Sequence, residues 1–283
     1  MNKVPRRQFL IAAAAFLLAP QVRAQATGRT YTIAVLNLSS RAAVEPYLSD
    51  FRDGLRENGF AEGQNVKFEY RFADYDFRKV ERLAEELVRL NVDVIFAPGT
   101  WAVHGAKAAT SKIPIVFATV NDPVVVKFVE SLARPGRNIT GVSIASLELT
   151  GKRLELLKET FPSAKRIGVL YNEDLFRACR TELKEVEQSA QKVGLEARRI
   201  SYADRSDIVQ AFDALRAARS EAVLIPSTSS YTEYSSDVVL LSASGKIPTM
   251  YEHERAVDAG GLMSYGPDYR WAHRRPRTMS RAS

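Results

Sequence analysis

The feature that most constrains the fold is an alternation of short apolar, β-branched runs with longer amphipathic segments along residues 31–265. Short runs of this kind predict buried strands, and apolar residues at three- and four-residue intervals predict helices. The predicted strands are residues 31–36, 66–72, 92–97, 114–120, 139–144, 166–171, 195–201, 222–226, 248–251 and 261–265. The clearest helical faces are Val44, Tyr47, Leu48, Phe51 and Leu55, then Val80, Leu83, Ala84, Leu87 and Val88, then Ile208, Ala211, Phe212 and Leu215. Such an alternation predicts parallel sheets with helices on both faces.

The pattern occurs twice. The apolar run at 33–36 is echoed at 167–170, and Lys112-Ile113-Pro114 is echoed as Lys246-Ile247-Pro248, both 134 residues later. A repeat of this length predicts two related, Rossmann-like α/β lobes. We expect a first lobe at 30–145, a second at 146–260 and a return crossing at 261–269. The first crossing between the lobes is expected near 143–150, where a strand ends and a helix begins.

The N-terminus is typical of an export signal. Basic residues precede an apolar run of 11 residues at 9–19, and Val22-Arg23-Ala24 resembles a cleavage site. The run is shorter than the roughly 20 residues that a membrane-spanning helix needs. Arg6-Arg7 is compatible with a twin-arginine signal, but Pro5 stands where a polar residue is usual, so a general secretory signal remains open. Either route predicts that 1–24 is a signal peptide and that the protein is periplasmic.

The charge of the chain lies at its two ends. Residues 1–24 carry four basic residues and residues 270–283 carry five, with no acidic residue in either segment. Removing these nine charges from the formal net charge of +7 leaves −2 for the body of the chain. The body therefore lacks the excess positive charge with which proteins bind nucleic acid, and no nucleic-acid partner is expected. Residues 270–283 lack apolar periodicity and are predicted to be an irregular basic tail.

Signatures of catalysis and of metal binding are weak. His104, His253 and His273 are far apart in the sequence, and none has the spacing of a metal ligand. Glu252-His253-Glu254 is interpreted as a solvated loop rather than an acid–base site. The single cysteine, Cys179, continues a helical apolar face and is interpreted as a buried thiol. We therefore predict no enzyme activity, no cofactor and no metal.

Polar residues at the carboxyl ends of predicted strands are the candidate ligand contacts, because α/β sheets bind ligands at this edge. Trp101 offers a flat aromatic face to a ligand, or it packs between loops. Asp122 pairs with a ligand ammonium group, or it caps the helix expected after Pro123. The serine, threonine and asparagine side chains have helix capping as their alternative role. The complete set is Ser39, Ser40, Thr100, Trp101, Asn121, Asp122, Tyr171, Asn172, Ser227, Thr228 and Tyr251.

Several longer segments resemble the substrate-binding proteins of bacterial ABC importers, in the branch with tryptophan- and tyrosine-type binders. They are FRDGLRENGFAEGQN at 51–65, IPIVF at 113–117, NDPV at 121–124, SLARPGRNITG at 131–141, KRLELL at 152–157 and AGGLMSYG at 259–266. The resemblance implies a type I periplasmic-binding fold whose lobes close over a small molecule, with an amino acid as the natural ligand. It also implies an ABC permease in the inner membrane as partner, and we expect the binding protein to be a monomer.

The chain departs from this family after about residue 270. Family members continue with a helix and further chain that complete the first lobe, and here the C-terminal part of that lobe is missing. We therefore expect the first lobe to have an uncovered sheet edge and an exposed core. Three other functions stay open: an extracytoplasmic sensor subunit, an enzyme built from two Rossmann-like lobes, and a non-functional truncated product.

Overall fold

The strands of the chain form two separate parallel sheets. The computed structural model describes residues 29–144, 146–173, 180–226 and 231–274, and within them each sheet has five strands. The first sheet contains β1 (Tyr31–Asn37), β2 (Val66–Phe72), β3 (Val94–Phe96), β4 (Ile115–Val120) and β5 (Ile139–Ser143). The second contains β6 (Arg166–Asn172), β7 (Glu196–Tyr202), β8 (Ala222–Leu224), β9 (Thr249–Tyr251) and β10 (Met263–Ser264).

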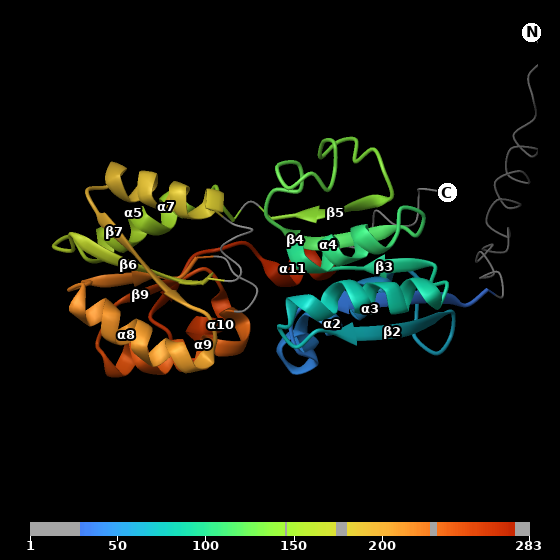
Figure 1. Ribbon diagram of the computed structural model, residues 1–283, viewed down its shortest axis with the longest axis horizontal. Coiled ribbons are helices and arrows are strands. Elements are labelled where there is room, and N and C mark those ends of the chain that lie inside the picture. The colour runs from blue at the N-terminus through green and yellow to red at the C-terminus, as the bar shows by residue number, and fades with distance from the viewer. Residues whose placement is uncertain (1–28, 145, 174–179, 227–230, 275–283) are drawn as a thin grey trace, which may run out of the picture.

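The two sheets have the same strand order. The first reads β2-β1-β3-β4-β5, and the second, from its opposite end, reads β7-β6-β8-β9-β10. The predicted repeat is confirmed, because the run at 33–36 lies in β1 and its echo at 167–170 lies in the equivalent strand β6. Each of the ten predicted strand runs overlaps an observed strand. The predicted class, α/β with two lobes and parallel sheets, is confirmed (Figure 1).

Helices cover both faces of each sheet. Those of the first lobe are α2 (Arg41–Glu57), α3 (Phe77–Arg89) and α4 (Thr100–Ala109). Those of the second are α5 (Thr150–Thr160), α7 (Arg180–Lys192), α8 (Ile208–Ala217), α9 (Tyr231–Ser244) and α10 (Glu254–Asp258), with a 3₁₀ turn at Arg205–Asp207. No helix in the described part of the chain is long and apolar enough to cross a membrane.

Alternating residues of the central strands build a core on each face. Ile33 and Val35 of β1 pack with α2, whereas Ala34 and Leu36 pack with α3 and α4. In the second lobe Ile167 and Val169 pack with α5 and α7, and the core on the other face is formed with α8 and α9. A parallel strand with both faces covered must be apolar on both sides, which explains its continuous apolar sequence.

The predicted irregular tail is partly wrong. Residues Tyr269–Arg274 form a helix, α11, that packs on α2 and β4 of the first lobe. Ala272 and His273 are buried there, and the Arg270 guanidinium donates two hydrogen bonds to the Asp50 carboxylate at 2.8 and 3.1 Å. The periodicity is too short to see in sequence, because only two neighbouring residues face the core. Residues 275–283 lie outside the described residues.

The expected exposure of the first-lobe core is also not seen in the described residues. Phe51 and Phe96, which stack with ring centroids 3.9 Å apart, are both buried. His273 of α11 packs against Phe96, with the ring centroids 6.1 Å apart. The open sheet edge corresponds to β5, which pairs only with β4. The predicted signal peptide at 1–24 lies outside the described residues.

Candidate functional site

The candidate residues of the first lobe follow three neighbouring strands. Ser39 and Ser40 follow β1, Thr100 and Trp101 begin α4 after β3, and Asn121 and Asp122 follow β4. Helices α2 and α4 leave the adjacent strands β1 and β3 toward opposite faces of the sheet. This reversal is the switch point at which parallel α/β sheets form a binding crevice. We call this edge the first rim.

Local hydrogen bonds fix the start of the first rim. The Ser39 backbone N–H donates to Asn37 Oδ1 at 2.9 Å, and Ser40 Oγ accepts from the Ala43 backbone N–H at 3.4 Å as the N-cap of α2. The capping role considered for Ser40 is therefore observed.

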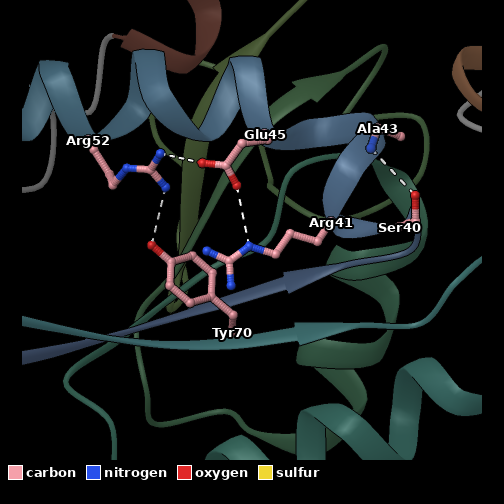
Figure 2. A network of polar contacts seen from close by, with 6 residues as sticks. All are labelled: Ser40, Arg41, Ala43, Glu45, Arg52 and Tyr70. Carbon is pink, nitrogen blue, oxygen red and sulfur yellow. Dashed lines mark hydrogen bonds and ion pairs between the residues drawn. The ribbon is translucent and has the colours of Figure 1, made fainter.

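A polar network holds the first turns of α2 against β2, as Figure 2 shows. The Arg52 guanidinium donates to Glu45 at 2.5 Å and to the Tyr70 hydroxyl at 3.5 Å, and Arg41 donates to Glu45 at 3.4 Å while lying over the Tyr70 ring. Burial opposes ionisation of Glu45, but the two guanidinium groups outweigh it and lower the pKa of its carboxyl. The network fixes the direction in which α2 leaves the rim.

Trp101 is half-buried between helices. Its ring centroid lies 4.7 Å from that of Phe77 on α3 and 6.0 Å from that of His104 on α4. These contacts show the packing role that was the alternative for Trp101. Thr100, the first residue of α4, follows Gly99, whose φ of 85° suits glycine.

Asn121 and Asp122 follow an irregular strand end. The pairing of β4 with β5 shifts register between Ala118 and Val120, and Thr119 between them has a φ of 60°. A β-branched residue rarely adopts this conformation, and such strain concentrates at functional sites. Asp122 Oδ1 accepts from the backbone N–H groups of Val124 and Val125 at 3.2 and 3.0 Å. Asp122 therefore caps a turn, and the helix expected after Pro123 is not formed.

The second rim is formed by the carboxyl ends of β6, β8 and β9. Asn172 is buried and its Nδ2 donates to the Ala203 carbonyl at 2.9 Å, and Tyr171 beside it is half-buried. Tyr251 is wholly enclosed in the second-lobe core, and its hydroxyl donates to Ser242 Oγ at 3.2 Å. These contacts give Tyr251 a structural role. Ser227 and Thr228 lie outside the described residues, as does Cys179.

The two rims face each other. The hydroxyl of Tyr47, on α2 of the first lobe, lies 2.5 Å from Nε2 of His253, which follows β9 of the second lobe. Close by, the Arg255 guanidinium of α10 donates to the Ala43 carbonyl of α2 at 3.0 Å. Figure 1 shows the lobes side by side, with β2 and β5 directed toward the second lobe. The contacts join the loop ends of both sheets rather than their opposite ends.

The interpretation of Glu252-His253-Glu254 as a solvated loop is wrong for its first two residues. Glu252 and His253 are only 3% and 5% exposed. They are buried because this segment meets both α2 and α11. Tyr269 of α11 stacks on the His253 ring with centroids 4.4 Å apart and donates its hydroxyl to Glu252 Oε1 at 2.7 Å.

Two tyrosines, Tyr47 and Tyr269, and two histidines, His253 and His273, are therefore brought together from distant parts of the chain. His273 stacks on Tyr47, with centroids 5.0 Å apart, so Tyr47 lies between His273 and His253. Burial, with the nearby Arg255 charge, lowers the pKa of His253 to about 4, and burial lowers the pKa of His273 to about 4. Burial also raises the pKa of the Tyr47 hydroxyl to about 12. All three side chains are therefore neutral at pH 7.

A buried arginine completes the junction. Arg153 of α5 is wholly buried, and its Nη2 lies 3.7 Å from Glu252 Oε1. Sequence reasoning missed Arg153 as a functional residue. The available signal was its position on the buried face of α5, where Thr150, Leu154 and Leu157 are its companions. A charged residue on such a face needs a partner.

The lobe boundary also holds a polar groove of about 640 Å³. It is lined by Asp50 of α2, by Glu254 and Asp258 of α10, by Asp268, and by Arg270, Trp271 and Arg274 of α11. A second hollow, of about 340 Å³ and mainly apolar, lies in the second lobe between α9 and the strand β9. Within the described residues no three histidine, cysteine or acidic side chains form a group that could hold a metal ion.

Comparison with known proteins gives a family match over most of the chain. A family described as ABC transporter substrate-binding protein matches residues 32–271. A tyrosine-binding protein of Clostridioides difficile is 28% identical over 238 residues, which are 84% of this chain and 68% of that protein.

Two solved structures of this kind differ in state. The ABC domain from Streptococcus pneumonia in complex with L-Trp is 26% identical, with a TM-score of 0.80 over 88% of this chain and 83% of that one. The ligand-free, open form of a substrate-binding protein with adhesive properties from Clostridium difficile is also 26% identical. Its TM-score is 0.61, over 87% of this chain and 82% of that one. The two structures have nearly the same identity to this chain and nearly the same coverage, but the TM-score is higher for the L-Trp complex. The backbone of this chain is therefore more similar to the L-Trp complex than to the open form.

Proposed function

Because the chain belongs to the ABC transporter substrate-binding protein family, we propose that it captures an aromatic amino acid between its two lobes and delivers it to an ABC importer. The observation that carries this proposal is the opposition of the two rims, seen in the Tyr47–His253 and Arg255–Ala43 contacts. A solute between the rims touches both lobes and stabilises the closed arrangement by its contacts with each. The closed form is then the one that the inner-membrane permease recognises.

The proposed ligand class follows from relatives and from the rim chemistry. One relative is a tyrosine-binding protein and another was solved with L-Trp. The first rim offers the indole of Trp101, the N-terminus of α4 and the carboxylate of Asp122. The indole suits an aromatic ring, the helix N-terminus suits a carboxylate, and the Asp122 carboxylate suits an ammonium group.

The proposed contact residues are those of the two rims: Ser39, Ser40, Thr100, Trp101, Asn121, Asp122, Tyr171, Asn172, Ser227 and Thr228. Tyr251 is left out, because its hydroxyl is bonded to Ser242 inside the core. We further propose that the protein acts as a periplasmic monomer and catalyses no reaction. The division into lobes at 30–145 and 146–260, with a return crossing at 261–269, is part of the same proposal.

Titration calorimetry with L-tryptophan and L-tyrosine tests the proposal. The purified chain is expected to bind at least one of them with 1:1 stoichiometry. Asp122→Asn keeps an oxygen for the turn cap but loses the charge, so a loss of affinity of about tenfold is expected if the ammonium contact exists. Glu130→Gln, on the same loop, serves as the control and should bind as the unchanged protein does. No heat with either amino acid, nor with other small solutes, would refute the proposed function.

A further inference from the structure

Two chain segments join the lobes in the described structure. The first runs from the end of β5 at Ser143 to the start of α5 at Thr150, and the second runs from the end of β10 at Ser264 to the start of α11 at Tyr269. We call them the first and second crossings. Any rotation of one lobe against the other must change backbone angles in or beside both crossings.

One side chain bonds to both crossings. Arg153 of α5 donates from Nη2 to the carbonyl and hydroxyl oxygens of Ser146 at 2.8 and 2.6 Å. It also donates from Nε to the Tyr265 carbonyl at 2.8 Å. Ser146 lies in the first crossing and Tyr265 in the second. The planar guanidinium presents its donors in a fixed fork, so it sets the two carbonyls at a fixed separation.

Glu252 reinforces both attachments from the other side. Its Oε1 accepts from the Ser146 hydroxyl in the first crossing and from the Tyr269 hydroxyl at 2.7 Å, just past the second. The second crossing is also tightly packed here, because a Cβ added at Gly266 would lie 2.0 Å from the Glu252 carbonyl oxygen. Arg153 and Glu252 have side chains only 1% and 3% exposed, so water does not compete for these bonds.

We propose that Arg153 and Glu252 are positioning residues for ligand capture, which anchor both crossings to the second lobe and so fix the axis about which the lobes close. Both residues belong to the second lobe, Arg153 on α5 and Glu252 after β9. The inference rests on the proposed function for its purpose, but the anchoring itself is a property of the chain without ligand.

The loss of the anchor should allow the lobes to open about more than one axis. A smaller fraction of molecules then has rims placed to receive the ligand, and the apparent dissociation constant rises by the inverse of that fraction. A tenfold loss of the competent fraction gives a tenfold weaker affinity.

The test measures the distance between the lobes by electron spin resonance of paired nitroxide labels. Cys179→Ser removes the native thiol, and Leu90→Cys on the first lobe and Val209→Cys on the second place labels at exposed positions. Arg153→Met combined with Glu252→Gln removes every bond of the guanidinium to the two crossings and leaves no unpaired buried charge, whereas Arg153→Met alone leaves the Glu252 carboxylate without its cation and risks misfolding. Arg153→Lys keeps the charge but not the fork. Thr249→Val is the matched control, since it breaks a buried hydrogen bond of the second lobe away from both crossings.

We expect the ligand-free double variant to give a clearly broader distance distribution than the parent, Arg153→Lys an intermediate one, and Thr249→Val the parental one. With L-tryptophan we expect about tenfold weaker binding by the double variant. An unchanged distribution in the double variant would overturn the proposal, as would equal broadening by Thr249→Val, which would indicate general destabilisation. If the parent binds neither L-tryptophan nor L-tyrosine, the proposed function fails, and the ligand-free distributions still decide the anchoring.

Discussion

The two lobes have one topology but are completed differently. In each lobe, a helix that follows a crossing lies beside the helix that follows the lobe's first strand: α5 lies beside α7 in the second lobe, and α11 lies beside α2 in the first. Helix α5 spans 11 residues and buries Arg153, Leu154 and Leu157, whereas α11 spans six and buries Ala272 and His273. The strand pattern therefore sets the fold of both lobes, while the crossing helices decide how the lobes are joined.

Buried polar groups follow the same division. The first lobe buries Asn37 and Ser39 at its rim and Asp50 beneath α11. The second lobe buries an arginine, Arg153, and a glutamate, Glu252, that touch the crossings.

Removing the buried arginine should produce the largest loss. Arg153→Met leaves the Glu252 carboxylate buried without its cation, which costs about 3–5 kcal/mol of unfolding free energy. Arg153→Met with Glu252→Gln should recover much of this loss. Urea denaturation followed by circular dichroism measures both. The importance of the second-lobe charge pair would be contradicted if the single variant lost less than the double variant.

Acidification should weaken the contacts between the lobes more than it weakens the packing inside either lobe. Because the pKa of His253 and of His273 is about 4 in the folded protein and near 6.5 when unfolded, the unfolded chain binds more protons between these values. Stability is therefore complete above about pH 6.5 and falls as the pH drops toward 4, by about 2 kcal/mol per histidine between pH 7 and 5.

Denaturation at these two pH values, with His273→Phe to keep the stacking on Tyr47, measures this effect. The variant should lose about half of the pH dependence. His104→Gln in the first lobe is the control and should change it less, because His104 is exposed. An equal effect of the two substitutions would place the pH dependence outside the junction.

The two strand-end asparagines should separate stability from binding. Asn37 ends β1 and Asn172 ends the equivalent strand β6, and the side chain of each hydrogen-bonds to backbone beyond its strand. Replacing either with alanine should cost about 1–2 kcal/mol of unfolding free energy. Only Asn172→Ala should also weaken L-tryptophan binding, since Asn172 is a proposed contact. Calorimetry that gave equal affinities for the two variants would remove Asn172 from the site.

The smallest effect is expected in α11. Ala272→Gly should cost about 1 kcal/mol or less, because glycine lowers helix stability and the helix is short. Hydrogen exchange should show faster opening of α11 amides, with those of α5 unchanged. Equal acceleration in α5 would mean that the two covering helices open together.

The sequence was sufficient to predict the strands that repeat in the two lobes, but not the contacts that join the lobes. The ten strand runs were visible because a strand covered on both faces must be apolar along its whole length, as in β1 and β6. The junction was not visible, since its bonds link residues far apart: Ser146 with Glu252 across 106 positions, and Arg153 with Tyr265 across 112. No local spacing records such pairs.

The candidate site was predictable only in outline. Strand ends located both rims, and the cap at Ser40 and the turn at Asp122 follow known local preferences. Burial of Tyr251 could not be foreseen, because its hydroxyl partner Ser242 lies on α9 and the contact depends on how that helix packs.

A crystal structure of the chain grown with L-tryptophan would show whether the two rims enclose the ligand. We expect density for the amino acid between the first rim, at the ends of β1, β3 and β4, and the second rim, at the ends of β6, β8 and β9, with Tyr47 and His253 still in contact. Density confined to the outer surface of one lobe, or rims turned away from each other, would contradict this expectation.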